Sequence, residues 1–148
     1  MKVAIGCDPN ASDQKEAVKK VLADLGHQVE DFGSTDPIYA NVAITLAEAV
    51  GAGKYERGIL LCGTGIGMSI AANKVSGAYA ALCTDVYSTE RSILSNNANI
   101  MCLGAQTCGI EHMKALVKAW MAVKWEAGSR SESKVARYRS YDIEHIKK

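Results

Sequence analysis

The residues best suited to chemistry lie in one short segment, LCGTGIGMSIAANK, at positions 61–74. Cys62 ends an apolar run, and glycines stand at positions 63, 65 and 67. Glycines allow the backbone to turn its N–H groups inward, and the start of a helix adds partial positive charge. Such a loop suits a negatively charged group, and a thiol beside it tends toward the thiolate form. A tight turn that binds no ligand is the alternative interpretation of this pattern.

A thiolate in this position can act as a nucleophile in acyl transfer or as a base that removes a proton. Cysteine nucleophiles usually have a histidine partner, but His27, His112 and His145 do not fall at the predicted carboxyl end of a strand. Removal of a proton next to a carbonyl, with the loop stabilising an enediolate, therefore fits Cys62 better. Nucleotide binding is disfavoured, because no lysine follows the loop and its match to GxGxxG is loose.

Composition limits the classes of function that this chain can have. Its 148 residues carry a formal net charge of +1, so we expect no nucleic-acid partner. No apolar stretch approaches the ~20 residues that span a membrane, and MKVAIGCDP is unlike a signal peptide, so we expect a cytoplasmic protein without a membrane partner. The five cysteines include no CxxC pair, which argues against disulfides and structural zinc. We interpret Cys7, Cys83, Cys102 and Cys108 as packing residues.

Short apolar runs alternate with helical patterns along the whole chain. The patterns predict strands at 3–6, 27–32, 57–62, 78–83 and 99–104, and helices at 12–25, 38–51, 66–74, 86–95, 109–124 and 131–146. Repeated strand–helix alternation predicts a parallel sheet covered by helices on both faces. We therefore expect a single domain over residues 1–148, an α/β/α sandwich of three layers with a five-stranded parallel sheet.

A functional site in such a sheet is expected at the carboxyl ends of the strands. In doubly wound sheets, ligands bind beyond the carboxyl ends of the strands, at the point where the strand order reverses. For the common order 2-1-3-4-5, the reversal lies between the first and third strands, which end near Asp8 and Cys62. We expect these two side chains to face each other across the crevice.

Four segments, MKVAIGCD, GHQVEDFG, RGILLCGTGIGMSIAANKV and NNANIMCLGA, closely resemble the ribose-5-phosphate isomerase B family, which includes galactose-6-phosphate isomerase. The resemblance runs from residue 1 to about 125 and implies a flavodoxin-like (Rossmann-like) fold. It also implies a homodimer or a tetramer with active sites where two subunits meet. We expect the C-terminal helix at 131–146 to take part in the dimer contacts. The implied activity is isomerisation between an aldose and a ketose sugar phosphate, without a cofactor or a metal.

The resemblance assigns roles to the residues of the glycine loop. Cys62 would be the base that moves a proton between C1 and C2, and Thr64 would help to move the hydroxyl and carbonyl protons. The backbone of Gly63, Gly65 and Gly67 would hold the developing oxyanion.

Three further roles follow from the same resemblance. Asp8 would contact the sugar hydroxyls and help to open the sugar ring. Tyr39 would line the pocket, and Asn96 would bind near the reacting carbonyl.

The chain departs from the family pattern at several site positions. Pro9 stands where the family usually has a histidine, and Ser95 stands where a histidine is credited with protonating the ring oxygen. Gln106 replaces the usual arginine after the fifth strand. The phosphate clamp near the C-terminus is only echoed, by Arg130 and Lys134, for which a solvated helix face is the alternative. The reaction core is therefore intact, whereas ring opening and phosphate binding are altered.

Family frequency makes ribose 5-phosphate, interconverted with ribulose 5-phosphate, the first expected substrate. The departures favour an alternative, D-erythrulose 4-phosphate interconverted with D-erythrose 4-phosphate, because a tetrose 4-phosphate cannot close a furanose ring. Two other hypotheses are a non-catalytic subunit of a heteromeric isomerase and a binder of flavin or nucleotide. The intact segment Cys62–Thr64 opposes the first of these. The absence of aromatic residues from the loops after the first and third strands opposes the second.

Overall fold

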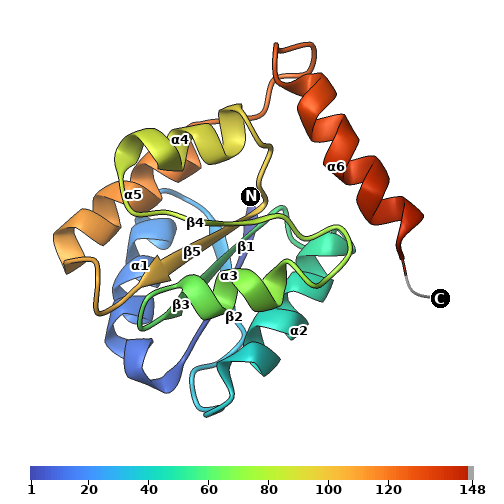
Figure 1. The fold of residues 1–148 in the computed structure, drawn as a ribbon. Helices are drawn as coiled ribbons and strands as arrows, with labels where there is room; N and C mark the ends of the chain where they lie inside the picture. The colour runs from blue at the N-terminus through green and yellow to red at the C-terminus, as the bar shows by residue number, and fades with distance from the viewer. Residues whose placement is uncertain (147–148) are drawn as a thin grey trace.

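The computed structural model describes residues 1–146 and contains a parallel sheet with helices on both faces (Figure 1). The strands are β1 Lys2–Cys7, β2 Gln28–Asp31, β3 Arg57–Cys62, β4 Ala80–Leu82 and β5 Ile100–Gly104. The helices are α1 Ser12–Asp24, α2 Tyr39–Gly51, α3 Ile66–Ala72, α4 Val86–Leu94, α5 Ile110–Ala122 and α6 Glu132–Glu144, and a short 3-10 helix spans Pro9–Ala11. The predicted α/β class and five-stranded parallel sheet are confirmed; residues 147–148 of the predicted domain lie outside the described residues.

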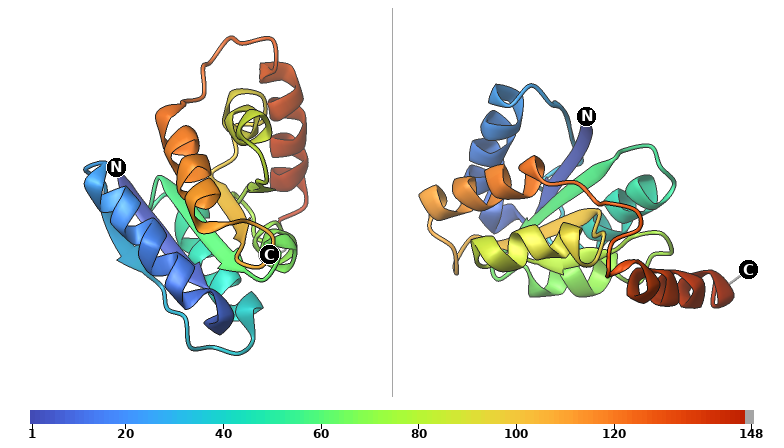
Figure 2. Two further views of the ribbon diagram at one scale, coloured as in Figure 1. Left: turned by 90° about the vertical axis from the view of Figure 1, so that its left-hand side faces the viewer. Right: turned by 90° about the horizontal axis from the view of Figure 1, so that it is seen from above.

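The helices form the two outer layers of the sandwich. Helices α2 and α3 cover one face of the sheet, and α1, α4 and α5 cover the other (Figure 2). Connections between parallel strands are right-handed, so the direction of each crossover decides the face on which its helix lies. The chain moves one way across the sheet through α2 and α3, and the opposite way through α1 and α4. Within residues 1–146, no helix is both long and apolar enough to cross a membrane.

The predicted strand order 2-1-3-4-5 is wrong at one edge, because the strands lie in the order β2-β1-β3-β5-β4. Strand β5 pairs with β3 along its full length. All five residues of β5 are buried, whereas the three residues of β4 are half-buried or exposed. The longer, fully buried strand therefore takes the interior position, and the short one forms the edge. The order still reverses between β1 and β3, so the predicted switch point is unchanged.

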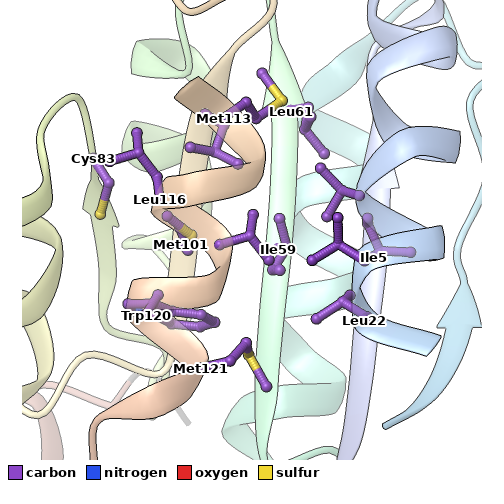
Figure 3. Packing of buried hydrophobic residues seen from close by; sticks show 14 of the residues in the cluster. Ile5, Leu22, Ile59, Leu61, Cys83, Met101, Met113, Leu116, Trp120 and Met121 are labelled. Atoms are coloured by element: carbon purple, nitrogen blue, oxygen red, sulfur yellow. The ribbon is translucent and has the colours of Figure 1, made fainter. Parts of the chain in front are cut away.

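Two apolar clusters attach the helices to the sheet. Side chains alternate along each strand, so Ile5, Ile59 and Met101 face α1, α4 and α5, where they belong to the same cluster as Trp120 (Figure 3). The cluster on the other face lies under α2 and α3 and includes Cys62. Burial of one large aliphatic side chain contributes about 1.5–3 kcal/mol. Because β1, β3 and β5 are packed on both faces, their carboxyl ends form a firm base for a site.

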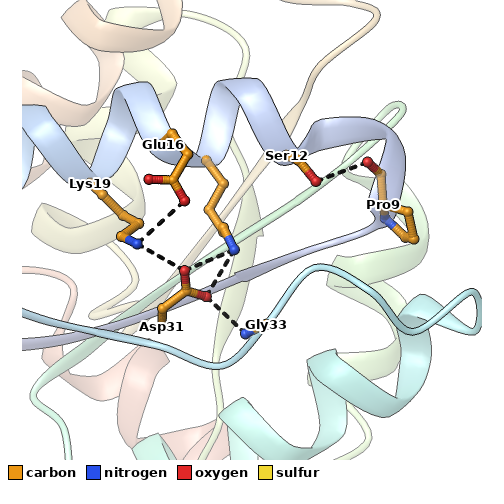
Figure 4. Close-up of polar contacts among 7 residues, drawn as sticks. Pro9, Ser12, Glu16, Lys19, Asp31 and Gly33 are labelled. Atoms are coloured by element: carbon orange, nitrogen blue, oxygen red, sulfur yellow. Dashed lines mark hydrogen bonds and ion pairs between the residues drawn. The ribbon is translucent and has the colours of Figure 1, made fainter.

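An ion pair joins α1 to the end of β2 (Figure 4). Lys15 is 3% exposed, and its Nζ lies 2.8 Å from Oδ2 of Asp31. The backbone N–H of Gly33 donates to Oδ1 of the same aspartate at 2.8 Å, and the carbonyl of Gly33 accepts from the N–H of Cys7 at 3.1 Å. This chain of contacts holds the end of β1 immediately before Asp8.

Helix α6 lies outside the two helical layers and projects away from the sheet (Figures 1 and 2), and its contacts are with the residues before β4 and after α4. It is attached mainly by polar contacts, and Val135 is its buried residue. The hydroxyl of Tyr79 donates to the carboxylate of Asp142 at 2.7 Å, and Arg139 lies over the Tyr79 ring and donates to the carbonyl of Asn97 at 3.2 Å. Burial, together with the bond to Asp142, raises the pKa of Tyr79 to about 12, so this hydroxyl keeps its proton near neutral pH.

Candidate active site

Cys62 is the last residue of β3 and therefore lies at the carboxyl ends of the parallel strands. Strand β1 ends beside it, since Cys7 pairs with Leu61 and the N–H of Asp8 donates to the Leu61 carbonyl at 2.8 Å. The Cys62 residue is 6% exposed, and its sulfur accepts the N–H of Gly65 at 3.1 Å. The thiol therefore points into the glycine turn, and Asp8 lies at the same carboxyl end of the strands.

The other four cysteines lack this setting. Burial raises the pKa of the Cys7 thiol to about 11, and it also raises the pKa values of Cys83, Cys102 and Cys108. These thiols keep their protons near neutral pH. Their burial agrees with the interpretation that they are packing residues.

The turn after Cys62 requires glycine at position 65. Gly65 has a φ of +79°, which L side chains rarely adopt. A Cβ atom there would also lie 2.6 Å from the Leu82 side chain and 2.9 Å from the backbone of Leu103. In this conformation the N–H of Gly65 donates to the Cys62 sulfur, and the expected role of Gly65 in holding an oxyanion stays a prediction.

Thr64 and Tyr39 border the same turn. Thr64 is exposed, and its Oγ1 accepts the N–H of Ile66 at 3.3 Å. Tyr39 is the first residue of α2, and its ring lies so close to Gly67 that a side chain at position 67 would collide with it. Glycine at 67 thus gives Tyr39 its place against the start of α3. The structure brings both residues to the turn that contains Cys62.

Asp8 follows β1 directly and is half-buried. Its Oδ1 accepts the N–H of Asn10 at 2.8 Å, so it caps the short helix that begins at Pro9. Proline fits the first position of a helix, where a backbone N–H has no partner within the helix. The carboxylate is thereby held at the carboxyl ends of the strands, where Cys62 also lies.

Ser95 and Asn96 lie at the other end of the strands, before the first residue of β5. They follow α4 and precede the first residue of β5, whereas Cys62 pairs with Gly104, the last residue of β5. The first and last residues of β5 lie about 13 Å apart, at a rise of roughly 3.3 Å per residue. A single copy of the chain therefore does not bring Asn96 to Cys62.

Arg130 and Lys134 also lie away from Cys62, around the start of α6. Both are exposed, and neither side chain forms a hydrogen bond or an ion pair within residues 1–146. Nearby, a cavity of about 600 Å³ opens between α6, α4 and β4. Asn96, Tyr79 and Tyr138 line this cavity, and Cys62 does not.

Sequence reasoning did not anticipate the contacts of two residues. The N–H of Gln106 donates to the carbonyl of Gly63 at 2.9 Å, and its side chain lies beside that glycine. The Nε of Arg91 donates to Oγ of Ser95 at 2.7 Å. The i, i+4 spacing in a predicted helix could have indicated the second contact. The first joins two loops that are distant in the sequence, so no local signal exists for it.

Comparison with known proteins identifies the family. Residues 3–138 match the Ribose/Galactose Isomerase family. A D-erythrulose-4-phosphate isomerase of Pectobacterium atrosepticum is 45% identical over 96% of this chain and 95% of its own length, and D-erythrulose-4-phosphate isomerase 2 of Mycolicibacterium smegmatis is 42% identical over 96% and 97%. The structure of Clostridium thermocellum ribose-5-phosphate isomerase B has a TM-score of 0.91 at 35% identity, and the match covers 98% of this chain and 99% of that one. The chain therefore belongs to the Ribose/Galactose Isomerase family and is an isomerase.

Proposed function

We propose that the protein interconverts D-erythrulose 4-phosphate and D-erythrose 4-phosphate by moving a proton between neighbouring carbons. The observation that carries this proposal is the position of Cys62, whose sulfur lies inside the glycine turn, 3.1 Å from the nitrogen of Gly65. A sulfur in this position can reach a carbon bound over the turn, while backbone N–H groups of the turn face the oxygen of that carbon.

The reaction passes through an enediolate. The Cys62 thiolate takes a proton from C1 of the ketose, and the electron pair left behind moves toward the oxygen on C2. The thiol then returns the proton to C2, and C1 becomes the aldehyde carbon. The substrate neither gains nor loses electrons, so the step balances without a co-reactant. A general base of this kind typically contributes about 10²–10⁴-fold to the rate.

The glycine turn supplies the other groups for this step. Because the N–H of Gly65 is bound to the sulfur, we assign stabilisation of the oxyanion mainly to the N–H groups of Gly63 and Gly67. The hydroxyl of Thr64 moves a proton between the oxygens on C1 and C2. Its exposure leaves it accessible to a substrate above the turn.

Asp8 and Tyr39 hold the rest of the sugar in this proposal. The carboxylate of Asp8 accepts a hydrogen bond from a sugar hydroxyl, since its Oδ2 bonds to nothing within residues 1–146. The Tyr39 ring, packed against Gly67, forms one wall of the pocket.

A second copy of the chain would complete the site. Asn96 is assigned to the reacting carbonyl, yet it precedes β5, whereas Cys62 pairs with the last residue of that strand. We therefore propose a homodimer in which each site combines Cys62 from one protomer with Asn96 of the partner subunit. Exposed apolar side chains are available for such an interface, among them Leu82 at the end of β4, Tyr87 near the start of α4, which is 74% exposed, and Ile143 near the end of α6.

Two observations favour a four-carbon substrate. Ser95 replaces the family's acid for ring opening, and its hydroxyl is engaged by Arg91. A tetrose 4-phosphate needs no such acid, because its O4 is esterified and cannot close a furanose ring. The relatives at 45% and 42% identity are both named D-erythrulose-4-phosphate isomerases. Ribose 5-phosphate is the second candidate, because the similar structure from C. thermocellum is a ribose-5-phosphate isomerase B.

Steady-state assays of the purified protein on both sugars test the proposal. We expect kcat/KM to be about tenfold or more higher with D-erythrulose 4-phosphate than with ribose 5-phosphate. A higher kcat/KM with ribose 5-phosphate would contradict the substrate assignment but retain the isomerase mechanism. Inactivity of the pure chain on both sugars would instead support the non-catalytic subunit.

A further inference from the structure

Arg91 and Ser95 form a polar corner at the end of α4. They lie one helical turn apart, and Nε of Arg91 donates to Oγ of Ser95 at 2.7 Å. Both side chains are half-buried. This bond fixes the plane of the guanidinium, whose two terminal nitrogens bond to no other group within residues 1–146.

The backbone around this corner is held from both sides. The side-chain amide of Asn96 donates to the carbonyl of Arg91 at 3.2 Å, and the carbonyl of Asn96 accepts from the hydroxyl of Tyr138 in α6. The next residue, Asn97, has a φ of +50°, and its carbonyl accepts from Arg139 at 3.2 Å. An arginine fork that is already fixed loses little conformational freedom when it binds an anion.

The charge of Arg91 has no partner of opposite sign in the described part of the chain. The ion pairs there involve lysines 15, 19, 20 and 114, and none includes this arginine. Arg57 provides a contrast, because its terminal nitrogens donate to the carbonyls of Trp120 and Val123 at 2.7 and 2.6 Å and thus have a structural role. A fixed, half-buried guanidinium without an internal partner, next to Asn96, indicates an anion from outside the chain.

We propose that Arg91, oriented by Ser95, binds the phosphate of the substrate and sets a preference for a four-carbon chain. This inference rests on the proposed function, in which Asn96 of the partner subunit meets Cys62. The phosphate of a tetrose 4-phosphate lies one carbon nearer to the reacting carbonyl than that of a pentose 5-phosphate. An arginine beside Asn96 suits that shorter distance, and its planar fork matches two phosphate oxygens. Ser95 is a positioning residue, because it acts through Arg91.

Substitutions at Arg91 test the inference with two independent readouts. We expect Arg91→Leu to raise the KM for D-erythrulose 4-phosphate about tenfold or more and to change kcat less than about threefold, since charged hydrogen bonds to the phosphate form before the reaction. In calorimetric titrations, inorganic phosphate should bind Arg91→Leu about tenfold more weakly than it binds the unmodified protein. Arg91→Lys should recover part of both losses. Ser95→Ala should raise KM by a smaller factor and leave kcat unchanged.

Arg137→Leu is the matched control, because it removes the same charge from α6, where the arginine contacts Ser140 at 3.3 Å. Both readouts should be unchanged in this variant. If Arg91→Leu does not fold by circular dichroism, Arg91→Gln provides the same comparison with a polar side chain. An unchanged affinity for inorganic phosphate in the folded variant would overturn the inference, whichever sugar is the substrate. Loss of phosphate binding in Arg130→Ala or Lys134→Ala, with no loss in Arg91→Leu, would also overturn it.

The assay on two sugars separates this inference from the proposed function. If the unmodified protein prefers ribose 5-phosphate while Arg91→Leu still loses phosphate affinity, the role of Arg91 in chain length is wrong and its phosphate contact stands. If Arg91→Leu loses affinity and the preference for the four-carbon sugar falls with it, both parts are supported.

Discussion

At the scale of single residues, Cys62 is set apart by its hydrogen bond. Among the five cysteines, it is the one whose sulfur accepts a backbone N–H from the glycine turn in the described structure. We expect Cys62→Ala to lower kcat about a thousandfold, because the variant retains the turn but has no base. Steady-state kinetics and a thermal melt check this together, and the melting temperature should fall by only a few degrees.

Cys108→Ala serves as the control for this prediction. Cys108 is also a buried free thiol, but it precedes α5, and its sulfur donates to the carbonyl of Gly109 at 3.7 Å and not to the glycine turn. Its substitution should leave kcat unchanged. If Cys62→Ala kept most of the activity of the unmodified protein, the proton-transfer mechanism would have to be abandoned.

The contact between Gly67 and Tyr39 allows a second prediction at this scale. A methyl group at position 67 would collide with the hydroxyl and ring of Tyr39. Since the ring is at the free end of a side chain, Gly67→Ala should push it away from the pocket without unfolding the protein. We expect KM to rise several-fold, by about the same factor as in Tyr39→Ala, because both variants remove the same wall.

A double-mutant cycle distinguishes this displacement from a direct effect on the turn. If Gly67→Ala acts through the ring, then in the Tyr39→Ala background it should add almost nothing to KM. Full additivity of the two effects would show instead that the methyl group disturbs the turn itself, and displacement of the Tyr39 ring would be wrong as the cause of the rise in KM.

At the scale of secondary-structure elements, the pair Lys15–Asp31 couples α1 to the ends of β2 and β1. Desolvation pushes the pKa of Asp31 up, but the hydrogen bonds from Lys15, Gly33 and Lys19 outweigh it and leave the pKa below its ordinary value. The folded protein therefore binds this proton less readily than the unfolded chain does. The pair contributes stability above the unfolded pKa near 4, and this contribution is lost as the pH falls through the folded pKa.

Asp31→Asn should therefore lower the free energy of unfolding by about 3 kcal/mol at pH 7, because the ammonium of Lys15 is left buried without a counter-charge. The difference from the unmodified protein should stay constant down to about pH 5 and shrink below about pH 4. Urea unfolding followed across this pH range measures it. Asp24→Asn, which breaks an exposed pair with Lys20 at 2.9 Å, should change stability by less than about 1 kcal/mol at any pH.

Local sequence patterns predicted all five strands and all six α-helices of the described structure, because these elements differ in their apolar patterns and are separated by glycine or polar residues, but they did not predict the 3-10 helix Pro9–Ala11. They did not predict the places of β4 and β5 in the sheet. The two predicted runs, 78–83 and 99–104, are equal in length and similarly apolar, but in the structure β4 has three residues and β5 has five. Their order depends on which strand is covered on both faces, and this is decided by helices far away in the sequence.

The candidate site divides in the same way. The turn from Cys62 to Gly67 is contiguous in the sequence, so residue types alone predicted a glycine turn after Cys62, but they did not predict that the N–H of Gly65 donates to the sulfur. The contact between Arg91 and Ser95 depends on a side-chain orientation that the hydrophobic period does not encode. The separation of Asn96 from Cys62 follows from the predicted parallel sheet, because Asn96 precedes the fifth strand whereas Cys62 ends the third, and the structure confirms this direction.

At the scale of the whole molecule, the proposed homodimer draws each site from the two ends of the strands. Cys62 and the glycine turn lie at the carboxyl ends, and Asn96 and Arg91 lie near the amino end of β5. Helix α6 extends from the amino end of β4, held by Tyr79 and Asp142 (Figure 1). An antiparallel arrangement of two copies would bring a carboxyl end and an amino end together twice, as a two-fold axis requires.

Mixing two inactive variants tests this arrangement directly. Cys62→Ala and Asn96→Ala should each be nearly inactive alone, because every site of either homodimer lacks one group. If each site combines Cys62 of one protomer with Asn96 of the other, a mixed dimer has one site with both side chains intact and one site with both missing. Random exchange at equal concentrations makes half of the dimers mixed, so the mixture should recover about a quarter of the activity of the unmodified protein. If Cys62 and Asn96 of the same chain formed the site, no mixture would recover activity, and the shared site would be wrong. Subunits are exchanged by gentle denaturation and refolding of the mixture, and size-exclusion chromatography before and after this step verifies that dimers are present.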